Sequence, residues 1–186
     1  FGVNTHNNLK ATVNKILNDP IIDHSDFILL TGDASQDETE QAYQQVVQLL
    51  SPLQKPVYWI PGNHDDPATM ADVFDRTPYF KQVDCLDLKH WRLIFLNSKT
   101  PGTDSGYLSQ HELEKLCFLI ESCHESQAIA IVIHHPPISI GNPLVDQYML
   151  INQRQFFDTI LPLTTGRHIT PPLIICGHVH CDHKAV

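Results

Sequence analysis

The stretch AIAIVIHHPP, residues 128–137, sets six apolar residues directly before two histidines and two prolines. A run of apolar residues without alternation is typical of a strand that is buried on both faces. The same pattern, a short apolar run followed by polar residues, recurs in DFILL (26–30), PVYWI (56–60) and LIIC (173–176). Strands of this kind occur in sheets covered by helices, so the four segments predict an α/β fold.

The segments between these strands favour helices, and strand and helix alternate along the chain. In residues 7–18, Leu9, Val13, Ile16 and Leu17 share one helical face, and Asp-Pro follows as a stop. A chain of 186 residues, 42% of them hydrophobic, can bury one sizeable core, so residues 1–186 are predicted to form a single domain. Further helices are expected at 37–50, 67–75, 108–122 and 152–161, and further strands at 82–87 and 91–96.

The composition limits the partners. The formal charge is −9 and the 12 Lys and Arg residues form no run, so we expect no nucleic-acid partner. A site that handles phosphate in this chain therefore needs another source of positive charge. No stretch approaches about 18 apolar residues and no hydrophobic leader is visible, so we expect neither a membrane span nor a signal peptide. Five cysteines without regular spacing fit a reducing compartment, and we expect a cytoplasmic protein.

Polar residues follow each of the four buried strands. Ligands of α/β sheets gather outside the carboxyl ends of strands, so these residues are expected to share one crevice. Residues i and i+2 of an extended chain face the same side, which turns His178 and His180 toward the crevice together. Mixed nitrogen and oxygen ligands suit Zn²⁺, Mn²⁺ or Fe, and two such ions would supply positive charge for phosphoryl transfer. The candidates are Asp33, then Asn63, His64, Asp65 and Asp66, then His134 and His135, and last His178 and His180.

Four motifs, taken together, resemble those of the calcineurin-like metallophosphoesterases. They are GDAS (32–35), GNHDD (62–66), HHPP (134–137) and GHVH (177–180), in this order. Longer matches resemble, within that superfamily, the bacterial class III cyclic nucleotide phosphodiesterases. These are FGVNT (1–5), GDASQD (32–37), PVYWIPGNHDD (56–66) and DQYMLIN (146–152).

The resemblance implies a four-layer α/β/β/α sandwich of two mixed sheets around a centre of two metal ions, Fe, Mn or Zn. By it, Asp33 bridges both ions, and His180 binds one of them. Three residues complete the site of the other ion: Asn63, His134 and His178. His64 is not a ligand but the catalytic residue that contacts the phosphate and stabilises or protonates the leaving group.

The reaction implied is attack of a metal-bound hydroxide on the phosphorus of 3′,5′-cyclic AMP, or a related cyclic nucleotide, to give 5′-AMP. We expect substrate contacts from Asn63, His64, His135 and His180. For His135, orientation of its loop is an equal alternative. A different phosphodiester, such as a 2′,3′-cyclic nucleotide or a glycerophosphodiester, and a non-catalytic binding module on the same fold remain alternatives, and the chain could act as a monomer or a homodimer.

The chain departs from the family's pattern in three places. Leu144 stands where relatives often have Trp, which leaves the nucleotide preference open. The family's first motif, Asp-x-His, would precede Phe1 and is absent from this chain. The last strands would follow Val186. We therefore expect a domain that is incomplete at both ends and lacks its first and last strands.

Several residues near the motifs are expected to have structural roles. Asp65 and Asp66 are interpreted as turn formers that bind backbone amides. Glycines before the polar residues, at 32, 62 and 177, remove a Cβ where the backbone passes closely. A local zinc site of Cys176 and Cys181 with the histidines between them is disfavoured, because all four ligands would come from six residues. Cys176 is instead expected to pack as a small apolar residue at the end of a strand.

Overall fold

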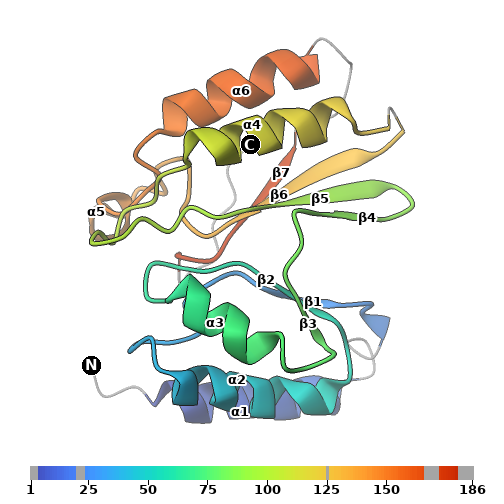
Figure 1. Cartoon of the computed structure of the whole chain (residues 1–186), viewed down its shortest axis with the longest axis vertical. Helices are drawn as coiled ribbons and strands as arrows, with labels where there is room; N and C mark the ends of the chain where they lie inside the picture. The colour runs from blue at the N-terminus through green and yellow to red at the C-terminus, as the bar shows by residue number, and fades with distance from the viewer. Residues whose placement is uncertain (1–3, 20–23, 125, 166–171, 180–186) are drawn as a thin grey trace.

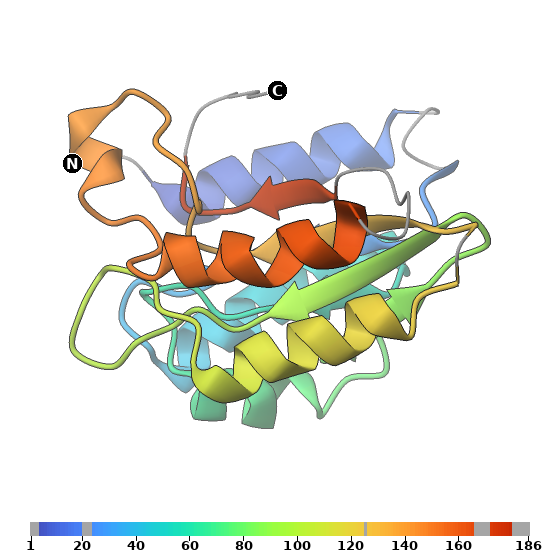
Figure 2. The same cartoon turned by 90° about the horizontal axis from the view of Figure 1, so that it is seen from above.

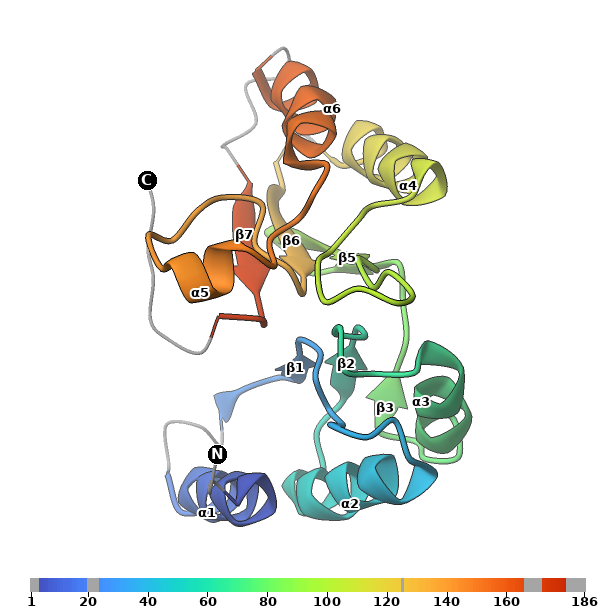
Figure 3. The same cartoon turned by 90° about the vertical axis from the view of Figure 1, so that its left-hand side faces the viewer.

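A computed structural model describes residues 4–19, 24–124, 126–165 and 172–179. In this part of the chain two sheets lie face to face (Figures 1 and 3). The first sheet holds three parallel strands in the order β1 (Ile28–Leu30), β2 (Val57–Trp59) and β3 (Phe80–Lys81). The second is mixed, since its first strand is antiparallel to the next, and its order is β4 (Cys85–Asp87), β5 (Trp91–Leu96), β6 (Ala128–Ile133) and β7 (Leu173–Cys176).

Helices cover the outer face of each sheet and complete the four layers. The first sheet is covered by α1 (Thr5–Leu17), α2 (Glu40–Leu50) and α3 (Pro67–Phe74), and a 3₁₀ turn, η2 (Ser51–Leu53), follows α2. Seen from above, α4 (Gln110–Glu121) and α6 (Gln153–Thr165) lie side by side over the second sheet (Figure 2). Among the described helices, none combines the length and the apolar character that crossing a membrane requires.

Local capping fixes where three of these helices begin. Thr39, Ser109 and Asp66 each accept a hydrogen bond from the backbone N–H three residues further on, at 3.2, 3.2 and 2.8 Å. These caps start α2, α4 and α3 and satisfy donors that have no partner within the helix. A cap of this type typically contributes about 1 kcal/mol to stability.

Three separate hydrophobic cores correspond to the three interfaces between the four layers. The first lies between the first sheet and its helices, where the ring of Phe74 meets those of Tyr43 and Trp59 edge to face at centroid distances of 5.9 and 5.4 Å. The second lies between the sheets and is formed by Ile60, Leu93, Phe95, Ala130 and Val132. The third lies between the second sheet and the pair α4 and α6.

Strand β5 shows why the apolar runs of this chain do not alternate with polar residues. Leu93 and Phe95 point into the core between the sheets, whereas Ile94 and Leu96 point into the core beneath α4. All four are at most 5% exposed. A strand buried on both faces needs apolar residues at every position, so the predicted four-layer arrangement is confirmed.

The strand predicted at 82–87 is correct only for its last three residues, which form β4 (Cys85–Asp87), and a separate strand, β3, precedes it at Phe80–Lys81. The chain instead pairs Phe80 with Val57 in the first sheet and Cys85 with Ile94 in the second, so residues 82–84 cross between the sheets. The short strands β3 and β4, which are close in sequence, therefore belong to different sheets.

Two helices at the carboxyl end of the described chain differ from the sequence prediction. Helix α5 (Pro143–Asp146) was not predicted, because four residues carry no helical periodicity. In Figure 1 it lies on the left, apart from both helix layers. Helix α6 continues past the predicted end at residue 161, through Pro162, to Thr165. The hydroxyl of the buried Thr164 donates to the carbonyl of Ile160 at 3.0 Å within this last turn.

The ends of β1, β6 and β7 meet at the junction of the two sheets. The carbonyl of His134 accepts the N–H groups of Gly177 and His178, both at 3.1 Å. A Cβ on Gly177 would lie 2.1 Å from the carbonyl oxygen of Thr31, closer than real contacts allow. The predicted need for glycine at position 177 is therefore confirmed, and the fold brings strand ends from both sheets together.

Candidate metal centre

Four side chains from four strand ends converge at this junction. Asp33 follows β1, Asn63 follows β2, His134 follows β6 and His178 follows β7. The Oδ1 atom of Asn63 lies 3.0 Å from Nε2 of His134 and 3.0 Å from Nδ1 of His178. These two nitrogens are 3.2 Å apart, and Oδ2 of Asp33 lies 3.3 Å from Nε2 of His134.

The spacing of these atoms suits ligands of one ion. Ligand atoms about 2.1 Å from a metal ion lie roughly 3.0–3.4 Å from one another in octahedral or tetrahedral sites. The measured separations of 3.0–3.3 Å fall in that interval. Two imidazole nitrogens, an amide oxygen and a carboxylate oxygen form a set that suits Zn²⁺, Mn²⁺ or Fe.

The tautomer of His134 agrees with a role as ligand. Its Nδ1 lies 2.7 Å from the carbonyl oxygen of Thr31, so this nitrogen carries the proton and donates it. The lone pair of Nε2 then faces Asn63 and Asp33. A histidine ligand commonly holds its ring in this way, by donating the other N–H to a carbonyl.

Asp33 brings negative charge to the same point. Burial alone would raise its pKa. When no ion is bound and His134 carries a second proton on Nε2, the hydrogen bond and charge of His134, together with the backbone N–H of His64, lower the pKa of Asp33 to about 2. Its backbone is in the left-handed region, with φ 55°. A non-glycine residue there costs roughly 1–3 kcal/mol, which the neighbouring contacts must offset. One of them is the bond from the His64 N–H to Oδ1 at 3.0 Å.

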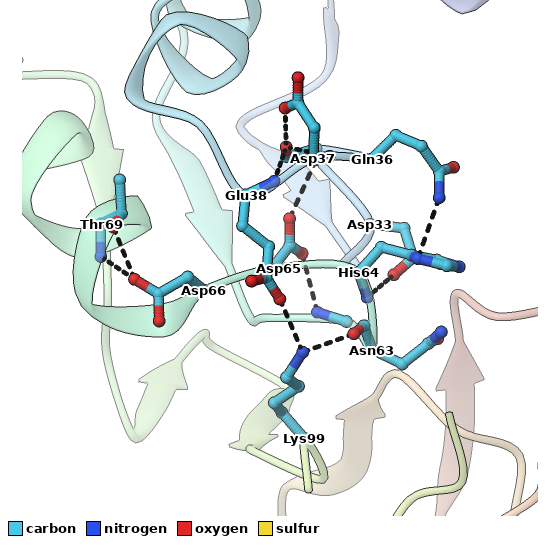
Figure 4. Close-up of polar contacts among 12 residues, drawn as sticks. Asp33, Gln36, Asp37, Glu38, Asn63, His64, Asp65, Asp66, Thr69 and Lys99 are labelled. Carbon is cyan, nitrogen blue, oxygen red and sulfur yellow. Dashed lines mark hydrogen bonds and ion pairs between the residues drawn. The ribbon is translucent and has the colours of Figure 1, made fainter. Parts of the chain in front are cut away.

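Asp65 and Asp66 have the structural roles expected of them. Asp65 is fully buried, and its carboxylate accepts the N–H groups of Gly62 and Ser35, both at 2.9 Å. It thereby ties the loop after β2 to the loop after β1 (Figure 4). Asp66 caps α3. Neither residue points into the group of four ligand atoms.

The side chain of His64 extends to the same side of the Asn63–His64 turn as that of Asn63 (Figure 4), but it contributes none of the four clustered ligand atoms. It is half-buried, and its Nδ1 lies 3.0 Å from Nε2 of Gln36. Because a carboxamide nitrogen only donates, Nδ1 accepts, and the proton of the neutral ring is on Nε2. His64 can therefore donate a proton from Nε2.

His135 lies beside the ligand atoms but has both ring nitrogens engaged. Nδ1 lies 2.8 Å from the hydroxyl of Ser98 and Nε2 lies 3.1 Å from the carbonyl oxygen of Asp104. The residue is fully buried. This geometry favours the alternative in which His135 orients a loop, here the loop after β5, over direct contact with substrate.

The burial of His135 has a consequence for stability. Burial, with the nearby charges of His134 and His178, lowers its pKa from 6.5 to about 3. Between these values the unfolded chain binds a proton that the folded chain does not, so the free energy of unfolding falls as the pH is lowered from 6.5 toward 3. We expect His135→Gln to make the free energy of unfolding less dependent on pH in this range, because glutamine binds no proton. Urea unfolding of the chelator-treated protein between about pH 7.5 and about pH 4.5 would measure it.

A matched control is His111→Gln, since the side chain of His111 is 83% exposed. This variant should keep the dependence of the parent protein. If His135→Gln also leaves the pH dependence of the free energy of unfolding unchanged, the assignment of a lowered pKa to His135 is wrong.

Known proteins of similar sequence place the chain in a family. The sequence model of the calcineurin-like phosphoesterases matches residues 2–182. The chain belongs to this family. The 3′,5′-cyclic adenosine monophosphate phosphodiesterase CpdA of Vibrio vulnificus is 33% identical over 168 residues, which are 87% of this chain and 58% of the relative. The CpdA of Haemophilus influenzae is 31% identical over 180 residues, 97% of this chain and 63% of the relative.

A third relative of this calcineurin-like phosphoesterase comes from Nostoc and is described as a 3′,5′-cyclic-nucleotide phosphodiesterase. It is 30% identical over 159 residues, 86% of this chain and 57% of the relative. The chain spans about three fifths of the length of these three relatives. The two-sheet, four-layer architecture is the one that resemblance to this family implies.

Two residues beside the candidate metal centre were assigned no role from the sequence patterns. One is Gln36, the partner of His64. The other is Lys99, whose Nζ lies 2.5 Å from the carbonyl oxygen of Asn63 and 3.3 Å from Oε1 of Glu38. Lys99 comes three residues after the end of β5, so the rule that ligands gather at strand ends could have found it.

Three further predictions can be placed or set aside. His180 lies outside the described residues, as does Cys181. Cys176 packs against the core beneath α4 and α6, as expected, and burial raises the pKa of its thiol to about 12. Leu144 is 76% exposed on α5, so it does not fill the place of a buried aromatic side chain.

Proposed function

We propose that this calcineurin-like phosphoesterase hydrolyses 3′,5′-cyclic AMP, or a related cyclic nucleotide, to the 5′-nucleotide. The observation that carries the proposal is the convergence of four ligand atoms, from Asp33, Asn63, His134 and His178, next to a histidine that can donate a proton. The names of the relatives, cyclic AMP or cyclic nucleotide phosphodiesterases, point to the substrate class. The five unpatterned cysteines support a cytoplasmic location.

The described residues divide into a charge-binding group and a proton donor. Asp33, Asn63, His134 and His178 would hold one ion, and His180 with Asp33 would hold a second. When bound, the ions supply positive charge to the phosphoryl oxygens and lower the pKa of water toward neutrality. Fe, Mn and Zn all suit these ligands.

His64 is placed to serve the leaving group. The amide of Gln36 holds Nδ1, so the proton-bearing Nε2 of the neutral ring remains for the substrate. When the ring of the cyclic diester opens, the departing 3′ oxygen takes up a proton. The neutral ring stabilises this oxygen by a hydrogen bond from Nε2, and the doubly protonated ring transfers the proton outright and is left as neutral imidazole. Help of this kind is typically worth about 10²–10⁴-fold in rate.

The test is a comparison of substrates on the full-length polypeptide loaded with Mn²⁺, Fe or Zn²⁺. We expect 3′,5′-cyclic AMP to be converted to 5′-AMP with a kcat/KM at least about tenfold above that for 2′,3′-cyclic AMP and for a glycerophosphodiester. A reversed preference would favour another phosphodiester as substrate. Metal binding without hydrolysis of any of the three would favour a binding module.

A further inference from the structure

A polar pocket of about 400 Å³ opens beside the candidate metal centre, on the side to which His64 points. It lies between residues 36–38 after β1, the Asn63–His64 turn and the loop 99–104 after β5. Its volume is within the range of pockets that bind small organic molecules. Asn63 and His64 both line this pocket, and Asn63 also supplies one of the candidate ligand atoms, so the pocket adjoins the candidate metal centre.

The wall formed by residues 36–38 is held rigidly. The hydroxyl of Ser35 accepts the N–H groups of Asp37 and Glu38 at 3.1 and 2.8 Å. Glu38 has a left-handed backbone, with φ 57°. The carboxylate of Asp37 accepts the hydroxyl of Thr39 at 2.8 Å, at the start of α2. These bonds fix the backbone of this wall, and the side chains of Gln36 and Glu38 are held separately by His64 and Lys99.

The opposite wall, the loop 99–104, is anchored at both ends. Lys99 binds the carbonyl of Asn63 and the carboxylate of Glu38, and its side chain is only 13% exposed (Figure 4). At the other end the ring of His135 holds the carbonyl of Asp104. Between the anchors, a Cβ on Gly102 would meet nothing within 4 Å. The loop therefore forms a fixed wall with an open edge.

The chemistry of the proposed reaction places one half of the substrate in this pocket. In a 3′,5′-cyclic diester, the bond from phosphorus to the 3′ oxygen breaks while the oxygen of water forms the new bond to phosphorus. The proton that water loses is balanced by the one that the 3′ oxygen gains. That oxygen belongs to the ribose, so a leaving oxygen at His64 brings the ribose to His64 as well.

We propose that this pocket is the subsite for the leaving half of the substrate, the sugar with its attached base. This inference rests on the proposed function. Among the described residues that line the pocket, none is Phe, Tyr or Trp, so a sugar is better suited to it than a stacked base. Amide, hydroxyl and carboxylate groups of Gln36, Thr103 and Glu38 are suited to hydrogen bonds with sugar hydroxyls.

The charged side chains that line the pocket disfavour negatively charged leaving groups. Three carboxylates, those of Asp37, Glu38 and Asp104, stand against one ammonium group, that of Lys99. A leaving group that carried further phosphates would be repelled. The pocket therefore selects an uncharged leaving group such as a nucleoside.

A bulky side chain in the pocket should weaken binding of the sugar without affecting binding of the phosphate. Thr103 lines the pocket and is half-buried on the loop with the open edge, so Thr103→Trp should occupy the space without disturbing a core. In the full-length polypeptide we expect the KM for 3′,5′-cyclic AMP to rise by at least about tenfold, because the indole excludes the sugar. Inorganic phosphate, which has no sugar, should inhibit with an unchanged constant.

The matched control is Thr159→Trp, at a position of α6 that is half-buried like Thr103 but lies outside both sites, which should leave both constants unchanged. If the parent protein hydrolyses cyclic AMP and Thr103→Trp keeps its KM within about twofold, the subsite assignment is wrong. It is also wrong if the KM and the inhibition constant of phosphate rise together, because the pocket would then not be a separate half of the site. Failure of the parent protein to hydrolyse cyclic AMP would instead contradict the proposed function.

Discussion

Replacing Asn63 by alanine in the full-length polypeptide is expected to abolish most of the metal binding and most of the cyclic nucleotide hydrolysis together. The Oδ1 atom of Asn63 is the point at which both histidines meet, at 3.0 Å from each. Loss of groups that merely support a ligand typically costs about 10–100-fold in metal affinity or activity. For the loss of a ligand we expect at least about 100-fold. Elemental analysis and turnover on the same preparation would measure both.

Two further variants separate loss of a ligand from loss of folding. Asn63→Asp keeps an oxygen at the same position and should retain much of the metal. Asn152→Ala removes another buried asparagine, one whose amide binds the backbone of Leu108 on both sides at 3.0 and 2.9 Å. It should lower stability but leave the metal content of the folded protein unchanged. Wild-type metal content and turnover in Asn63→Ala would remove Asn63 from the site.

The sequence predicts strands accurately where burial on both faces removes any ambiguity. The strands at 91–96, 128–133 and 173–176 have the predicted bounds, because every residue of β5 and β6 after the first two faces one core or another. The prediction at 82–87 holds only for residues 85–87, because pattern alone does not separate β3 from β4. Local pattern shows that a residue is in a strand, but it does not show which sheet completes the pairing.

The convergence of the four candidate ligands can be predicted from sequence because each follows a strand, and parallel strands bring their ends to one edge. The residues that contact these candidate ligands are harder to predict from sequence. Gln36 and His64 are 28 residues apart, and their hydrogen bond depends on how two loops pack. The same holds for Lys99, which reaches Asn63 over 36 residues. Contacts between loops follow from the assembled fold, which sequence spacing does not describe.

Replacing His64 by alanine should leave the metal content largely intact and slow the reaction of cyclic AMP by about 10²–10⁴-fold. His64 contributes none of the four clustered ligand atoms, and Gln36 holds its Nδ1, so its loss removes a donor at Nε2 and no ligand. The measurements are kcat and metal content of the same preparation. His111→Ala, at a side chain that is 83% exposed, is the matched control and should change neither.

Comparing substrates with different leaving groups distinguishes proton donation from other roles of His64. An ester that releases p-nitrophenolate needs little protonation, because this anion is stable near neutral pH. With bis(p-nitrophenyl) phosphate we therefore expect His64→Ala to lose far less activity than with cyclic AMP, since general acid catalysis helps most where the leaving group is a poor one. An equal loss on both substrates would mean that His64 contacts the phosphoryl group or shapes the loop. A change below about threefold on cyclic AMP would remove His64 from the chemical step altogether.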